Sequence, residues 1–344
     1  MNTEETYQLL KEKLNGIVPD FELRLKAELA VEINRLKIEK NAVILGHNYM
    51  DPVLYHSVAD FRGDSLELSR KAAETDKSII VFCGVKFMAE TAKILNPTKT
   101  VLIPSLAGCS LAESITAADV RALKKRFPGV PVITYINTYA EVKAETDICC
   151  TSGNAAQVVE SLHADTVIFL PDEFLARNVA RETGKHIIFP VPGPCPAGSE
   201  TELDFQMIGW RGRCEVHEKY TVQDIVHVRA QFPQVLILAH PECSPEVVAE
   251  SDFSGSTSSM IAYIRNSSAP QYLLLTECSM ADNIAAENPG KEMLRLCAVR
   301  CPHMNQITME NTLDALKHLR YKIEIPEEIR LRAFTAVERM LHIG

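Results

Sequence analysis

The chain has 344 residues, and at roughly 100 to 200 residues per domain this length predicts two or three domains or one large composite. Hydrophobic residues make up 46% of the chain and charged residues 24%, which is typical of a packed globular protein and excludes disordered, collagen-like and coiled-coil classes. The formal net charge of -9 disfavours nonspecific binding to nucleic acid or anionic membranes, so an anionic ligand must be held by local dipoles and a few placed cations.

The N-terminal residues carry no pattern of a signal peptide or membrane anchor. Residues 1–14 alternate charged and apolar side chains, and no apolar run approaches the ~18 residues that cross a bilayer. Ten cysteines without a secretion signal indicate reduced thiols, some of which are candidate metal ligands. We therefore expect a cytoplasmic protein that binds neither nucleic acid nor membrane, with a helical segment at residues 1–37 packing outside the first domain.

A first α/β unit is predicted at residues 38–113. One helix-like stretch begins at the small hydroxyl residue Ser65, and the next contains Ala89. The last strand of the unit leads to Cys109. The predicted strands are apolar and lie at residues 42–49, 78–83 and 100–105.

A second unit at residues 126–218 repeats this order. Ser152 precedes one helix-like stretch, Ala176 lies in the next, and the last strand leads to Cys214. The Pro/Gly-rich stretch at residues 190–209 is interpreted as an inserted surface loop. The predicted strands lie at residues 130–137, 166–171 and 186–191.

A third unit at residues 232–305 has the same landmark residues in the same order. Thr257 precedes its first helix-like stretch, Ala281 lies in the second, and the unit ends near Cys301. A helical segment at residues 306–344 follows it. The predicted strands lie at residues 235–242, 272–278 and 294–299.

Two sets of landmarks give the same spacing between units. The three hydroxyl residues are separated by 87 and 105 residues, and the three alanines are separated by the same two intervals. The cysteines lie 44, 62 and 44 residues after the hydroxyl residues, so the second unit is longer by 18 residues. The interval of 105 residues also exceeds that of 87 by 18. The inserted loop in the second unit accounts for both differences. We infer three copies of one unit.

Strands that alternate with helices predict parallel sheets with right-handed crossovers. The expected fold class is α/β, with three homologous three-layer αβα domains around a pseudo-threefold axis. Ligands of such domains bind beyond the carboxyl ends of the strands. We therefore expect the polar ends of the first strands, and the three cysteines, to meet at one central site.

Three converging thiolates fit two kinds of metal centre. Zinc needs a fourth protein ligand or a water, whereas a 4Fe-4S cluster held by three cysteines leaves one iron open to a substrate. We prefer the cluster, because cysteines from widely separated units suit a group larger than one ion. The remaining cysteines are given no metal role: Cys83, Cys149, Cys150, Cys195, Cys243, Cys278 and Cys297.

The hydroxyl residues and strand ends supply further candidates. A hydroxyl residue at a helix N-terminus helps to hold a carboxylate or phosphate, although each one taken alone is more often only an N-cap. His217, three residues after Cys214, is a candidate substrate contact or partner of the metal centre. The acid/base candidates at the strand ends are His47, Tyr49, Tyr135, Asn137, His240 and Glu242.

Longer motifs extend these patterns over nearly the whole chain. They are HNY at His47, GDSLELSR at Gly63, FCGVKFMAETAKILNP at Phe82, AGCSLAES at Ala107, TYINTYAEVKA at Thr134, TSGNA at Thr151, FLPDEFLA at Phe169, WRGRCEVH at Trp210, AHPEC at Ala239, GSTSSM at Gly255 and CPHM at Cys301. In this order they resemble the quinolinate synthase family, the iron-sulfur enzymes of NAD biosynthesis.

The resemblance implies a reaction and its participants. Iminoaspartate condenses with dihydroxyacetone phosphate to give quinolinate, phosphate and two waters, and L-aspartate oxidase is the candidate partner that supplies iminoaspartate. The implied cofactor is a 4Fe-4S cluster, with one open iron acting as a Lewis acid, and the implied ligands are Cys109, Cys214 and Cys301. The implied catalytic residues are His47, Tyr49, His240 and Glu242. The implied substrate contacts are His47, Ser65, Tyr135, Asn137, Ser152, His217, His240, Glu242, Ser256 and Thr257.

One stretch departs from the family pattern. Residues 190–209, which include Cys195, are longer than the usual link to the segment at Trp210, so we expect the loop around Trp210 to differ in shape. The segment that contains Cys214 is intact.

Two other functions remain open. A cluster-dependent hydratase acting on a hydroxy acid would use the same open iron but would need no phosphate site. A noncatalytic iron-sulfur or zinc sensor would form no quinolinate, and no DNA-binding or electron-partner motif supports it.

Overall fold

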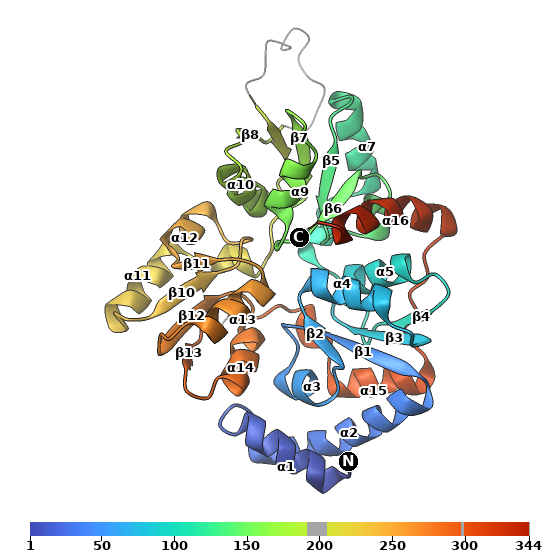
Figure 1. Cartoon of the computed structure of the whole chain (residues 1–344), viewed down its shortest axis with the longest axis vertical. Helices are drawn as coiled ribbons and strands as arrows, with labels where there is room; N and C mark the ends of the chain where they lie inside the picture. Colours follow the sequence, from blue (N-terminus) through green and yellow to red (C-terminus); the bar gives the residue numbers. More distant parts are fainter. Residues whose placement is uncertain (191–204, 297–298, 344) are drawn as a thin grey trace.

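The computed structural model of this chain describes residues 1–190, 205–296 and 299–343. It contains three α/β units arranged around a common centre, each with a parallel sheet covered by helices (Figure 1). The predicted fold class is therefore confirmed. Cys195 and Cys297 lie outside the described residues.

The elements of the first unit are β1 (Ala42–His47), α3 (Pro52–Ser57), β2 (Phe61–Gly63), α4 (Ser65–Glu74), β3 (Ile79–Cys83), α5 (Lys86–Leu95), β4 (Thr100–Leu102) and α6 (Ser110–Glu113). The strand order is β2-β1-β3-β4 and all pairs are parallel. Strand β1 is buried along its whole length, as expected for the centre of a sheet covered on both faces. The short strand β2 was not predicted.

The elements of the second unit are α7 (Ala117–Arg126), β5 (Val132–Tyr135), α8 (Ala140–Lys143), β6 (Ile148–Cys150), α9 (Ala155–Ser161), β7 (Val167–Leu170), α10 (Glu173–Glu182), β8 (Ile187–Ile188) and β9 (Met207–Gly209). The strand order is β6-β5-β7-β9-β8, so the strand beside β7 is β9. The prediction that residues 186–191 form the third repeated strand was therefore wrong. All three residues of β9 are buried whereas β8 is only half-buried, so β9 takes the inner position and β8 the edge.

The elements of the third unit are η1 (His217–Lys219), α11 (Val222–Gln231), β10 (Leu236–Ala239), α12 (Pro245–Glu250), β11 (Phe253–Ser254), α13 (Thr257–Asn266), β12 (Gln271–Leu275), α14 (Cys278–Glu287), β13 (Glu292–Leu294) and η2 (Met304–Gln306). The strand order β11-β10-β12-β13 matches that of the first unit. The third strand predicted at residues 294–299 was misplaced, because the residues paired with β12 are Glu292 to Leu294.

A third set of landmarks supports the repetition. In each unit an aspartate just before the short edge strand accepts a backbone N–H from the first strand, at 2.8 Å. The pairs are Asp60 with Ile44, Asp147 with Val132, and Asp252 with Ile237. The aspartates are again 87 and 105 residues apart.

The repetition also continues beyond each cysteine. A threonine seven residues after Cys109, Cys214 and Cys301 is the N-cap of a ten-residue helix. These helices are α7, α11 and α15 (Met309–His318). The predicted units stop short of them, so the predicted domain boundaries stay a prediction.

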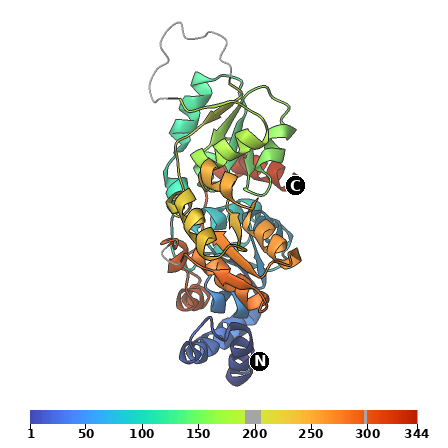
Figure 2. The same cartoon turned by 90° about the vertical axis from the view of Figure 1, so that its left-hand side faces the viewer.

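Two helices precede the first unit, α1 (Thr3–Leu14) and α2 (Asp20–Glu39). They form one end of the molecule (Figure 2). Tyr7, Leu10 and Leu23 pack there with Val53 of the first unit in a separate apolar cluster. Among the residues that the structure describes, no helix is both long and apolar enough to span a membrane.

The last helix, α16 (Glu327–Leu341), joins the first two units. Its apolar face lies in one large cluster with residues of both units, whereas the third unit has clusters of its own. The buried Asn154, before α9, donates from Nδ2 to the carbonyls of Met340 at 3.3 Å and Ile343 at 2.9 Å. Arg70 of α4 donates to the carbonyl of Leu341 at 3.1 Å. The end of the chain therefore holds helix α4 and the loop before α9 together.

Replacing Asn154 with alanine tests this contact. Asn154→Ala removes the side-chain donor of the Met340 and Ile343 carbonyls and the buried acceptor of the Thr151 N–H, so we expect the free energy of unfolding to fall by about 1–3 kcal/mol. Urea denaturation followed by circular dichroism measures the change. The matched control is Asn266→Ala at the exposed end of α13, which should leave the midpoint unchanged. Equal midpoints for the two variants would show that the contact contributes nothing.

Candidate active site

One cavity lies where the carboxyl ends of the three sheets meet. Residues of all three units line it, and its volume is about 710 Å³ with the open space at its mouth included. Small-molecule sites typically measure roughly 300–1,000 Å³. Every predicted site residue except Ser256 lines the cavity, and Ser256 is buried as the N-cap of α13, one residue before Thr257.

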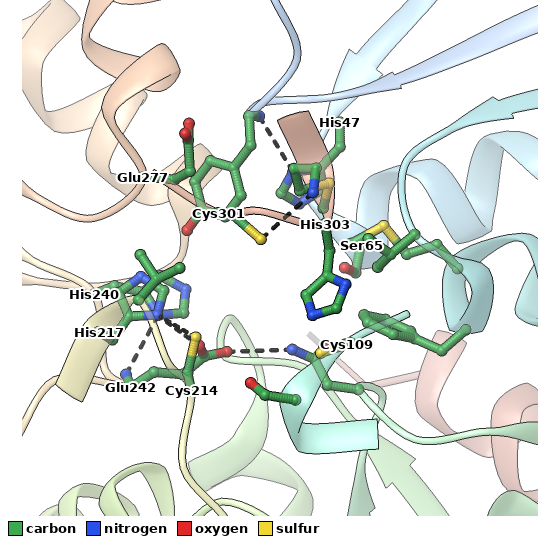
Figure 3. Close-up of a pocket in the computed structure, with 18 of the residues that line it drawn as sticks. His47, Ser65, Cys109, Cys214, His217, His240, Glu242, Glu277, Cys301 and His303 are labelled. Atoms are coloured by element: carbon green, nitrogen blue, oxygen red, sulfur yellow. Dashed lines mark hydrogen bonds and ion pairs between the residues drawn. The ribbon is translucent and has the colours of Figure 1, made fainter. Parts of the chain in front are cut away.

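The three predicted cysteine ligands are brought together in this cavity. Cys109, Cys214 and Cys301 are partly exposed to it, whereas the other described cysteines are buried. Figure 3 shows the three around one open space, with His217, His240 and Glu242 grouped on one side. The buried set is Cys83, Cys149, Cys150, Cys243 and Cys278.

Each of the three sulfurs sits in the same backbone setting. N–H groups of the residues two and three positions further on interact with the sulfur in all three units. The pairs are Leu111 and Ala112, Val216 and His217, and His303 and Met304. Such N–H groups stabilise a thiolate and orient it as a metal ligand.

The thiols need a cation to ionise. Burial raises the pKa of Cys109 to about 12 and that of Cys301 to about 11, and it raises the pKa of Cys214 well above its usual value. At neutral pH the thiols are therefore protonated unless a metal replaces the proton. The donor set is suited to metal binding and is poorly suited to act as free nucleophiles.

Two histidines at strand ends act as neutral hydrogen-bond donors. His47 Nδ1 accepts the N–H of Tyr49 at 3.2 Å, and His240 Nδ1 accepts the N–H of Glu242 at 3.3 Å. The ring proton is then on Nε2, which in His240 lies 3.3 Å from Ser152 Oγ. Burial lowers the pKa of His47 to about 4 and that of His240 to about 3, so both rings are uncharged at neutral pH.

Glu242 is the centre of a hydrogen-bond network. Its Oε2 lies 2.7 Å from His217 Nδ1, while Oε1 accepts the hydroxyl of Tyr135 and lies 3.4 Å from Asn137 Nδ2. Burial alone would raise the pKa of this carboxyl, but the neighbouring His217 and the hydrogen bonds from His217 and Tyr135 lower it below its usual value. Glu242 is therefore a carboxylate at neutral pH.

A threonine connects Tyr49 to this network. The hydroxyl of Tyr49 lies 2.6 Å from Thr276 Oγ1, and the same oxygen lies 2.9 Å from His217 Nε2. A continuous row of hydrogen bonds therefore runs from Tyr49 to Glu242. Sequence reasoning missed Thr276, although it follows the second strand of its unit, at the same sheet edge as the other candidates.

The predicted hydroxyl residues do not cap their helices. The N-caps of α4, α9 and α13 are Asp64, Asn154 and Ser256, which leaves Ser65, Ser152 and Thr257 free of that role. The alternative that these three hydroxyls are only N-caps is therefore wrong. All three side chains line the cavity.

The described lining of the cavity has carboxyl side chains but no lysine or arginine. The carboxyl residues are Asp64, Glu215, Glu242 and Glu277. Burial raises the pKa of Glu277 to about 7, and Glu277 was also missed by sequence reasoning. An anion bound here must be held by hydroxyl groups, imidazole N–H groups, helix N-termini or a metal.

A buried lysine holds the loop of Tyr135 and Asn137 from behind. Lys143 is fully buried, and its Nζ donates to the carbonyls of Ile136, at 2.9 Å, and Thr138. These carbonyls flank Asn137. A lysine within a helical stretch is usually an exposed residue, so nothing in the sequence singled out Lys143.

Comparison with known proteins gives full-length matches. The family model described as Quinolinate synthetase A protein matches residues 31–342. A quinolinate synthase of Caulobacter vibrioides is 51% identical over 337 residues, which cover 96% of this chain and 86% of that protein. Quinolinate synthase 2 of Mesorhizobium japonicum is 51% identical over 335 residues, covering 97% of each chain. The quinolinate synthase of Agrobacterium fabrum is 48% identical over 344 residues, which cover 100% of this chain and 94% of that protein.

The positioning role of Lys143 can be tested by an apolar replacement of similar size. Lys143→Met removes the Nζ donor from the carbonyls of Ile136 and Thr138, of which Ile136 keeps only the N–H of Thr138, and it loosens Asn137, so we expect kcat/KM to fall by about 10- to 100-fold. Steady-state kinetics of the metal-loaded chain measures the change.

The matched control for this variant is Lys291→Met. Lys291 also donates to backbone carbonyls, those of Ile264 and Ser267, but it does not line the cavity. We expect a similar loss of stability and unchanged kinetics. If the two variants lose activity equally, Lys143 acts only through stability.

Proposed function

This chain belongs to the quinolinate synthetase A family, and we propose that it condenses iminoaspartate with dihydroxyacetone phosphate to give quinolinate, phosphate and two waters. Family membership makes it an enzyme of NAD biosynthesis. The observation that carries the finer proposal is the meeting of three equivalent thiols, one near the end of each repeat, in a cavity that also presents hydroxyl groups at helix N-termini.

The proposed cofactor is a 4Fe-4S cluster with Cys109, Cys214 and Cys301 as its ligands. The donor set fits this group, because the three sulfurs come from three units, line one cavity and have backbone N–H partners at equivalent positions. When bound, such a cluster supplies an iron with an open position, which is a Lewis acid for a substrate oxygen.

The proposed anion contacts come from helix N-termini and neutral imidazoles. Ser65 and Thr257 are the first residues of α4 and α13, helices of 10 residues each, where backbone N–H groups carry partial positive charge. Ser152 and His240 offer a hydroxyl and a ring N–H on a third side. These groups suit the carboxylates and the phosphate of the two proposed substrates.

The proposed proton transfers centre on Glu242 and Tyr49. Glu242 is ionised and accepts a proton from the substrate, while Tyr135 and Asn137 fix its orientation. Burial raises the pKa of Tyr49 well above its usual value, so the phenol keeps its proton and can donate it to a departing oxygen. Thr276 and His217 then return the proton from Glu242 to Tyr49 along the row of hydrogen bonds.

Two expectations from the sequence stay predictions. They are the cytoplasmic location and the supply of iminoaspartate by L-aspartate oxidase. The two alternative functions are separated from the proposal by product analysis, because a hydratase would work without dihydroxyacetone phosphate and a sensor would form no quinolinate.

Replacing the three cysteines tests the cofactor and the activity together. The anaerobically prepared chain should contain about four irons and four sulfides and should form quinolinate only when dihydroxyacetone phosphate is present. Cys109→Ala, Cys214→Ala and Cys301→Ala should each abolish both the iron-sulfur absorption and quinolinate formation. The control is Cys83→Ala, a buried thiol that lies beside Thr312 and outside the cavity. Full iron content in any of the three cavity variants would contradict the ligand assignment.

Replacing Glu242 with its neutral amide tests the proton transfer. Glu242→Gln keeps the shape but not the basicity, so kcat should fall by about 100- to 10,000-fold while the iron-sulfur absorption is retained. The matched control is Glu246→Gln at the exposed start of α12. An unchanged kcat with an intact spectrum would assign the proton transfer to another group.

A further inference from the structure

Three different metal-donor atoms converge on one side of the cavity. The Sγ of Cys214, Nδ1 of His217 and a carboxylate oxygen of Glu242 all lie within 4.8 Å of one another. The sulfur is 3.2 Å from Nδ1, which is 2.7 Å from Glu242 Oε2. Among the described residues, no other three cysteine, histidine, aspartate or glutamate side chains form so compact a group.

The donor set is typical of zinc. Zinc accepts cysteine sulfur, histidine nitrogen and carboxylate oxygen, and three protein ligands with a solvent molecule as the fourth form a common tetrahedral site. Zinc–ligand bonds of about 2.0–2.3 Å place tetrahedral ligands about 3.4 Å apart. The 3.2 Å separation of Cys214 Sγ and His217 Nδ1 is about 0.2 Å below this value, and the 2.7 Å separation of Nδ1 and Glu242 Oε2 is about 0.7 Å below it. His217 and Glu242 must therefore move apart by about 0.7 Å to admit the ion.

The surroundings already orient two of the three donors, His217 and Glu242. Thr276 Oγ1 lies 2.9 Å from His217 Nε2 and can accept its proton, so the lone pair of Nδ1 points at the group once the proton that Nδ1 shares with Glu242 is displaced. The stacked ring of His240, with its centroid 4.5 Å away, fixes the plane of His217. Tyr135 binds the other oxygen of Glu242. Partners of this kind typically support metal ligands.

We propose that, when no iron-sulfur cluster is bound, this chain binds one zinc ion through Cys214, His217 and Glu242. Zinc replaces the thiol proton of Cys214 and the proton between His217 and Glu242, and both protons pass to the solvent. The solvent position faces the cavity.

Zinc and the cluster exclude each other because both require Cys214. This second part of the inference rests on the proposed function, whereas zinc binding itself does not. A chain that has taken up zinc is therefore expected to be unable to accept the cluster until the zinc is removed.

Zinc titration of the metal-free chain tests the site. With zinc alone as the probe, competition against a chromophoric chelator under anaerobic conditions should give one zinc per chain. Cys214→Ala, His217→Asn and Glu242→Gln should each lower the affinity by more than about 100-fold, since even the outer partners of metal ligands are worth about 10- to 100-fold. Thr276→Val should lower it by about 10-fold.

The matched controls are the other two cavity cysteines. Cys109→Ala and Cys301→Ala should bind zinc as tightly as the unchanged chain, although neither should accept the cluster. If these two variants lose zinc as strongly as Cys214→Ala, the ion is held by three cysteines and the inference is wrong. Circular dichroism and urea denaturation of every variant identify any that are unfolded, and retained zinc binding in folded His217→Asn would also overturn the inference.

Cluster assembly in the presence of zinc tests the exclusion. Iron and sulfide added to the zinc-loaded chain should give no iron-sulfur absorption, whereas the zinc-free chain should develop it. Folded His217→Asn keeps the three cysteines and should accept the cluster whether or not zinc is added. Cluster formation on the zinc-loaded chain with zinc retained would refute the exclusion. Failure of the zinc-free chain to form any cluster would instead refute the proposed cofactor and leave the zinc site intact.

Discussion

The constraint on the proposed site is that its described lining offers no lysine or arginine, although both proposed substrates are anions. Attraction must then come from partial charges, which are weak singly and act only over short distances. Helix N-termini, hydroxyl groups and uncharged imidazoles provide them, and each must be aimed at the same small volume. The thiols of Cys109 and Cys301 have raised pKa values and stay protonated at neutral pH unless a metal replaces the proton.

The threefold repetition of one unit brings these groups to a common cavity. The carboxyl end of a single parallel sheet presents one hydroxyl residue at or just before a helix and one cysteine loop. Three such ends facing a common centre give three of each, as the equivalent N–H partners of the sulfurs illustrate. The network around Glu242 draws on the second and third units together, since Tyr135 belongs to one and Glu242 to the other. No unit alone contains the chemistry.

Regular spacing in the sequence predicted the three repeated units, whereas the strand order within the second unit depends on burial and was not predicted. The intervals of 87 and 105 residues predicted three units and the meeting of their cysteines. They could not show that β9 displaces β8 from the inner position, because that depends on which strand is more deeply buried. Thr276 and Lys143 were missed since each acts through three-dimensional contacts that no local pattern records. The threonine N-caps seven residues after each cysteine follow a regular spacing, but they were not predicted.

The position of the last helix has a consequence for synthesis. The carbonyls of Met340 and Ile343 accept hydrogen bonds from Asn154, and the carbonyl of Leu341 accepts one from Arg70. The loop before α9 and helix α4 therefore lack these contacts until α16 has emerged from the ribosome. The ribosome adds residues from the N-terminus onward, and its exit tunnel encloses the newest ones. Both segments therefore reach their final arrangement only after α16 and the residues that follow it have left the tunnel.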